Sequence, residues 1–167
     1  MLGTTGYGLW DTGRAKLEQI FAQAMGCEDA LVRSQFMSGT HTLAVALFGL
    51  LRTGDTLLAA TGRPYDTLEG VIGIDGKGKG TGTLTDYGIR YEEVPLGADF
   101  VPDYQAIAAA APRAKVCHIQ RSRGYMQRNA FDLETIRKVA RVAKEANPSI
   151  IVFVDNCYGE FTQTEEP

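Results

Sequence analysis

The chain has 167 residues, of which 44% are apolar and 22% are charged, and its formal net charge at pH 7 is −3. This composition predicts a globular domain and excludes an intrinsically disordered chain. The sequence pI of about 5.4 gives no basic surface for nucleic acid or an anionic membrane, and the longest apolar run, Leu43–Leu51, is too short to span a bilayer.

The predicted elements alternate between helical spacing of apolar residues and short runs that are rich in β-branched residues. In chain order they are a helix over 13–25 capped by Asp11 or Thr12, a strand over 30–36, a helix opened by Ser38 and running through Leu51, a strand over 55–60, a helix over 66–72, a strand over 89–94, a helix over 104–111, a strand over 115–119, a helix over 133–146 and a strand over 150–154.

Near-continuous apolar strands separated by helices indicate a mostly parallel sheet covered on both faces. The predicted fold class is therefore α/β, a three-layer sandwich. In such sheets ligands bind at the carboxyl ends of the strands. The loops around Ser38, Gly62, Gln120 and Asp155 are the places where a site is expected.

Two other kinds of site lack support. Gly73–Gly80 resembles a nucleotide phosphate loop, but Gly80 stands where Ser or Thr is required, and the segment follows a helix instead of a strand. The three cysteines form neither a Cys-x-x-Cys pair nor a disulfide framework, and with only two histidines they make no zinc ligand set. We expect no metal and, without a signal-peptide pattern after Met1, a reducing, cytoplasmic setting.

The first candidate segments for chemistry are Ser38-Gly39-Thr40 and the loop that carries Tyr65. A helix amino terminus offers free N–H groups to a phosphate, and Ser38 and Thr40 could add hydroxyl donors. Taken alone, a simple capping role for Ser38 is the commoner one. Tyr65 could stack on a planar ligand, although a Tyr in such a loop more often serves ordinary packing.

The most informative residue is Asp155, which follows the apolar run 150–154. An acid at the end of a buried strand is costly unless a partner offsets its charge. A protonated pyridine nitrogen could do so, and a metal ion or a helix cap are the alternatives. After the preceding strand, Arg121 and Arg123 could grip a carboxylate or phosphate as a substrate-binding pair, or could belong to a solvated loop.

Taken together, the chain resembles the Cys/Met-metabolism family of pyridoxal-phosphate enzymes, the cystathionine γ-lyase/methionine γ-lyase group, and especially its "aluminium resistance" branch. The segments that carry the resemblance span almost the whole chain; they are 5–14, 31–41, 46–49, 62–68, 120–125 and 154–161. The resemblance implies a fold-type-I, aspartate aminotransferase-like large domain that binds pyridoxal 5′-phosphate.

The resemblance also implies roles for individual residues. Ser38, Gly39 and Thr40 match the phosphate-binding turn, Tyr65 the residue stacked on the ring, and Asp155 the partner of the pyridinium nitrogen. Tyr7, with Arg14, is similar to a stretch that reaches the phosphate of a neighbouring subunit. A homodimer or homotetramer is implied, with an amino acid as the substrate and neither nucleic acid nor membrane as a partner.

The sequence departs from the family at one point. The family's Schiff-base lysine follows the strand that ends in Asp155, whereas all six lysines here precede it. We therefore expect residues 1–167 to be a partial cofactor-binding domain that lacks an amino-terminal segment, the lysine region and the small carboxyl-terminal domain. By itself it would have no catalytic residue and would be inactive.

The function expected of the parent protein is carbon–sulfur bond elimination from a sulfur-containing amino acid. An aminotransferase or a desulfurase of the same fold is the second reading, because cofactor contacts alone do not fix the reaction. A catalytically silent α/β module that serves assembly is the third.

Overall fold

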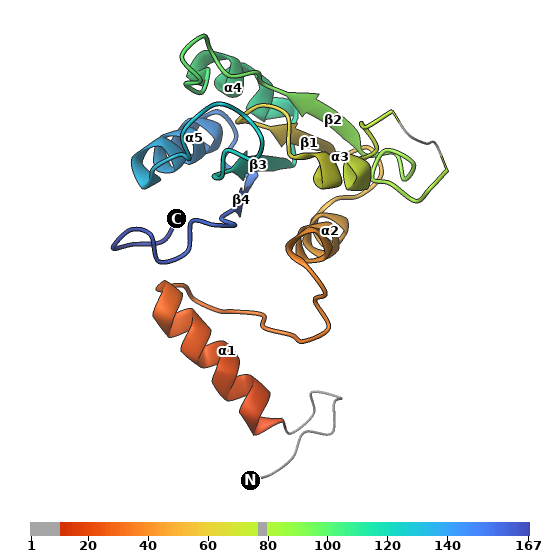
Figure 1. Ribbon diagram of the computed structural model, residues 1–167. Helices are drawn as coiled ribbons and strands as arrows, with labels where there is room; N and C mark the ends of the chain where they lie inside the picture. Colours follow the sequence, from red (N-terminus) through yellow and green to blue (C-terminus); the bar gives the residue numbers. More distant parts are fainter. Residues whose placement is uncertain (1–10, 77–79) are drawn as a thin grey trace.

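The computed structural model describes residues 11–76 and 80–167 as a four-stranded parallel sheet with helices on both faces (Figure 1). The strands, in the sheet order β2-β1-β3-β4, are β2 (Arg90–Glu93), β1 (Thr56–Ala59), β3 (Val116–Gln120) and β4 (Ile151–Asp155). The helices are α1 (Thr12–Met25), α2 (Gly39–Leu50), α3 (Asp66–Ile72), α4 (Tyr104–Ala110), the 3-10 turn η1 (Ala111–Arg113) and α5 (Leu133–Ala146).

Two apolar clusters make the layers of the sandwich. Because successive strand residues point to opposite faces, Leu57 packs with residues of α2 and α3, whereas Leu58 packs with residues of α4 and α5. The predicted three-layer α/β architecture is confirmed. None of the helices in residues 11–76 and 80–167 is both long and apolar enough to cross a bilayer.

The predicted strand over 30–36 is wrong. This segment has no regular structure apart from a turn at 34–35. A strand needs a neighbour for its backbone hydrogen bonds, but here the amide of Val32 donates to the Glu18 carboxylate over 3.1 Å. Arg33 pairs with the same carboxylate, and Leu31 is exposed. Among residues 11–76 and 80–167 no strand pairs with this segment, which connects α1 to α2.

All other predicted boundaries agree with the structure to within one residue. Helix α5 illustrates why these boundaries could be predicted from the sequence. Its apolar residues Leu133, Ile136, Val139 and Ala143 recur on one helical face, and all are buried against the sheet. A capping Asp132 accepts a hydrogen bond from the Thr135 amide at 2.8 Å and fixes where the helix begins.

Candidate functional site

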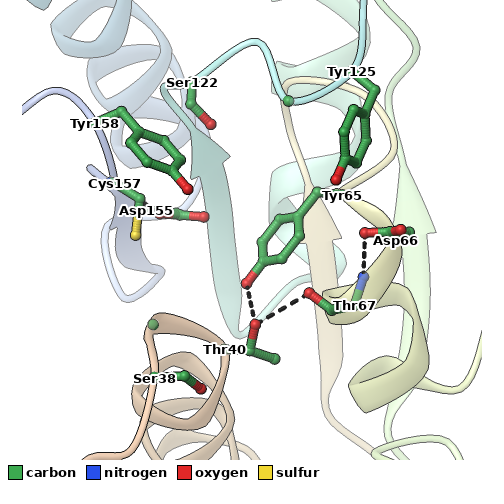
Figure 2. A pocket seen from close by; sticks show the side chains of 12 residues that line it. Ser38, Thr40, Tyr65, Asp66, Thr67, Ser122, Tyr125, Asp155, Cys157 and Tyr158 are labelled. Carbon is green, nitrogen blue, oxygen red and sulfur yellow. Dashed lines mark hydrogen bonds between the residues drawn. The ribbon is translucent and has the colours of Figure 1, made fainter.

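A pocket of about 440 Å³ lies where the carboxyl ends of the strands meet the start of α2 (Figure 2). Its walls come from four separate parts of the sequence. The lining residues are Ser38, Gly39, Thr40, Tyr65, Asp66, Thr67, Ser122, Gly124, Tyr125, Asp155, Cys157 and Tyr158. The structure thus brings together five of the predicted site residues, which the sequence separates by more than a hundred positions.

The start of α2 forms one end of the pocket. Ser38 is the N-cap, with extended backbone, and its hydroxyl oxygen accepts a hydrogen bond from the His41 amide at 3.1 Å. Ser38 therefore serves as the N-cap of α2. The first N–H groups of a helix have no partner within it and carry partial positive charge, so Gly39 and Thr40 bring donors to the pocket wall. This end suits an anion.

Tyr65 forms the next wall and is held at its hydroxyl. The phenol oxygen lies 2.9 Å from the Thr40 hydroxyl, which in turn lies 3.1 Å from the Thr67 hydroxyl (Figure 2). Partial burial raises the pKa of Tyr65, and the hydrogen bonds to Thr40 and Thr67 oppose that rise. The phenol is neutral at physiological pH, and its ring stays available as a flat apolar surface.

Asp155 ends β4 and is only 2% exposed. One carboxylate oxygen accepts a hydrogen bond from the Cys157 amide at 3.1 Å. Figure 2 shows the side chain pointing from the strand end toward the Tyr65 ring. No basic side chain of the described residues forms an ion pair with this carboxylate, and a buried acid is stabilised by a cation beside it.

His118 lies on the same sheet face as Asp155, because Gln120 pairs with Asp155 and His118 is two residues earlier on β3. Burial lowers the pKa of His118 to about 4, against the opposing effect of the Asp155 carboxylate. The imidazole is therefore neutral at pH 7, and within the described residues its Nε2 has no hydrogen-bond partner. It therefore carries no positive charge that could pair with the Asp155 carboxylate.

Cys157 was not singled out as a site residue, yet it lies between the two ends of the pocket. A Cβ added to Gly39 would lie 3.4 Å from its Sγ, so the glycine lets α2 approach the end of β4. Burial, followed by a hydrogen bond with Asp155, raises the pKa of the thiol to about 12. Because a protonated thiol is a poor nucleophile, we assign Cys157 no chemical role. Its side chain forms part of the pocket wall.

The two predicted arginines lie elsewhere. Arg121 is 3% exposed, and its guanidinium donates to the Asn156 side chain at 2.7 Å and to the Gly159 and Phe131 carbonyl oxygens at 2.9 and 3.2 Å. It ties the loop after β3 to the loop after β4. Arg123 is exposed and lines neighbouring hollows. Neither residue lines the pocket that holds Asp155.

Other parts of the site came from outside the predicted set. Thr67 completes the hydroxyl chain, and Tyr125 and Tyr158 flank the pocket from the two loops (Figure 2). Tyr158 has a positive φ of 69°, which is uncommon for a bulky residue and is typical of constrained functional loops. Tyr7 lies outside the described residues, and Arg14 forms an ion pair with Asp11 at 3.6 Å.

The arrangement has a defined chemical preference. The pocket wall carries amide and hydroxyl donors at the start of α2, the buried carboxylate of Asp155 and the aromatic ring of Tyr65. A phosphate monoester attached to a cationic heteroaromatic ring presents groups that are complementary to all three. The residues present fit such a molecule.

Comparison with known proteins shows the family to which the chain belongs. The family model described as methionine gamma-lyase matches residues 1–167. The chain belongs to the methionine gamma-lyase family. A curated member of similar sequence, uncharacterized protein YnbB of Bacillus subtilis, is 52% identical over 165 residues, which are 98% of this chain and 39% of that protein.

Solved structures extend the likeness to other members. A candidate cystathionine beta-lyase involved in aluminum resistance from Listeria monocytogenes is 48% identical, with a TM-score of 0.92, and the match covers 98% of this chain and 41% of that one. A carbon-sulfur lyase involved in aluminum resistance from Clostridium novyi is 42% identical, with a TM-score of 0.92 over 99% of this chain and 40% of that one. The chain therefore spans about two fifths of the length of these relatives.

Proposed function

We propose that this chain is the cofactor-binding part of a pyridoxal-phosphate-dependent carbon–sulfur lyase that acts on sulfur-containing amino acids. The observation that carries the proposal is the buried Asp155, which shares one pocket with the start of α2. Membership of the methionine gamma-lyase family and the lyase named for the Clostridium novyi structure support the choice of reaction.

Each wall of the pocket has a role in this proposal. Gly39 and Thr40 would hold the phosphate through backbone and hydroxyl donors, and Tyr65 would lie against the ring. Asp155 would keep the ring nitrogen protonated, since opposite charges at 4 Å attract by about 4 kcal/mol at an effective dielectric near 20. When bound, the cofactor supplies an electron sink for a substrate carbanion.

The chain's own residues would bind and orient the cofactor without catalysing the reaction. None of Lys16, Lys115, Lys138 and Lys144 lines the pocket, and the proposed proton acceptor is a lysine outside these 167 residues. We also propose that the functional form is a homodimer or homotetramer. The isolated chain should therefore bind the cofactor without turning over an amino acid.

Binding of pyridoxamine 5′-phosphate, measured by calorimetry and by ³¹P NMR, tests the proposal. This form of the cofactor has no aldehyde and cannot react with surface lysines. Asp155→Asn should weaken binding at least about tenfold, since a loss of about 1.4 kcal/mol suffices. The matched control is Asp66→Asn, which removes an exposed acid from the same pocket and should change affinity little.

Two outcomes would reject the cofactor assignment. One is absence of binding by the unaltered chain at millimolar ligand, and the other is equal losses in the Asp155 and Asp66 variants. Pyridoxamine without its phosphate should bind far more weakly, because the α2 contacts are lost. Equal affinity for both compounds would show that Gly39 and Thr40 do not bind the phosphate.

The reaction is tested by placing this chain in the Bacillus subtilis relative in place of the matched 165 residues. Release of ammonia and a keto acid from methionine or cystathionine would support elimination. Transfer of the amino group to an added keto acid would instead identify an aminotransferase. A chimera that folds, binds the cofactor and catalyses neither reaction would favour a silent assembly module.

A further inference from the structure

Gln120 does not line the pocket, but its side chain is hydrogen-bonded to two residues that do. It ends β3, pairs with Asp155 across the sheet and is 5% exposed. Its side-chain Oε1 accepts a hydrogen bond from the Tyr65 amide at 2.9 Å, and its Nε2 donates to the Ser122 carbonyl oxygen at 3.2 Å. One buried amide thus joins two loops that form different walls of the pocket.

The backbone of Gln120 is itself fixed at both ends. Its amide donates to the Thr61 hydroxyl at 3.0 Å. Its carbonyl oxygen accepts from the guanidinium of Arg128, a buried side chain, at 3.2 Å. The side chain therefore extends from a rigid base. The loop beyond Ser122 also closes over it, because a Cβ added to Gly124 would lie 3.2 Å from Gln120 Nε2.

These contacts complete the support of Tyr65. The backbone N–H of Tyr65 donates to Gln120, and the hydroxyl of Tyr65 bonds to Thr40. Tyr65 is therefore held at its backbone and at the far end of its side chain. We propose that Gln120 is a positioning residue that fixes Tyr65 and the 122–125 loop around the cofactor. The inference rests on the proposed function, because the benefit of a fixed ring is the cofactor that lies against it.

The neutral amide suits this place better than an acid. Gln120 and Asp155 are register partners on adjacent strands, so a carboxylate at 120 would set two negative charges side by side. A side-chain amide offers both an acceptor and a donor from the same uncharged group. A carboxylate would keep the acceptor for Tyr65 and lose the donor for Ser122.

Amide exchange measured by NMR on the ligand-free chain tests the hydrogen bond directly. In Gln120→Met, exchange at the Tyr65 amide should become about tenfold faster, the effect expected for one lost hydrogen bond. In Gln120→Glu the acceptor remains, and Tyr65 should stay protected. Ile119→Val is the control, because Ile119 is buried in the apolar cluster on the opposite face of β3.

Binding of pyridoxamine 5′-phosphate then tests the consequence. Gln120→Met should weaken binding about tenfold, while Ile119→Val should leave it within about twofold. Equal loss in both variants, or unchanged Tyr65 exchange in Gln120→Met, would overturn the positioning role. If the unaltered chain bound no ligand, the proposed function would fail, whereas the exchange result would still decide whether Gln120 holds Tyr65.

Discussion

The helices α1 and α5 have the same length and opposite surroundings. Each has 14 residues, and each begins after an aspartate whose side chain accepts a hydrogen bond from an amide three positions on. α5 lies against the sheet with four buried residues, whereas α1 stands apart from it and buries none (Figure 1). Local capping therefore sets where a helix begins, and the rest of the fold decides how much the helix contributes to stability.

The apolar residues of α1 sharpen the contrast. Leu17, Ile20 and Phe21 recur on one face and are 42%, 49% and 40% exposed. An apolar face of this kind is typical of a surface that packs against another chain or segment. The proposed homo-oligomer offers such a cover. The two helices should accordingly respond differently to the same substitution.

The largest difference is expected from a matched pair of isoleucines. Ile136→Ala in α5 removes a side chain that is 3% exposed, and it should lower the free energy of unfolding by about 2–5 kcal/mol. Ile20→Ala in α1 should lower it by less than about 0.5 kcal/mol. Urea unfolding followed by circular dichroism measures both. Similar losses would mean that α1 is packed in solution.

Self-association gives the next largest effect. Ile20→Glu places a charge in the apolar face of α1 and should reduce any association seen by sedimentation equilibrium at least about tenfold, since burying an unpaired charge is costly. Gln19→Glu adds the same charge to the opposite face of the helix and is the control. Association that survives Ile20→Glu unchanged would exclude this face from the interface.

The sequence predicted most of the fold because its helices and strands carry local signals that the sheet reinforces. Residues 66–72 and 133–146 were placed with the bounds that the structure gives them. The strand predicted over 30–36 is wrong for the opposite reason, since its apolar residues are only a local signal and no strand of the described residues pairs with it. Strand formation depends on pairing that no single segment encodes.

The site was predictable where a residue combined an unusual type with a strand or helix end, as at Asp155 and Ser38. It was not predictable where a common residue acts through distant partners. Gln120 meets Tyr65 across 55 positions, and Thr67 matters only because Thr40 lies beside it. Arg121 lies at a strand end, as Asp155 does, and was therefore predicted to bind a ligand. Its guanidinium instead bonds to residues of the loop after β4, which its position in the sequence does not reveal.

The smallest effect concerns the two capping aspartates. The side-chain and backbone hydrogen bonds of Thr135 lower the pKa of Asp132 from its ordinary value of 3.8. A carboxyl group with a lowered folded-state pKa stabilises the fold above the unfolded-state value, and that contribution is lost as the pH falls through the folded-state value. Asp132→Ala should therefore cost about 1 kcal/mol at pH 7.

As the pH falls below 3.8 and through the lower folded-state pKa of Asp132, the unfolding free energies of Asp132→Ala and the unaltered chain should approach each other, because the cap then loses its charge. Asp11→Ala, which removes the acceptor for the Arg14 amide in α1, should reduce helical circular dichroism without moving the urea midpoint at any pH. A midpoint shift of similar size in both variants would show that α1 unfolds together with the sheet, and the contrast between the two helices would then be one of exposure alone.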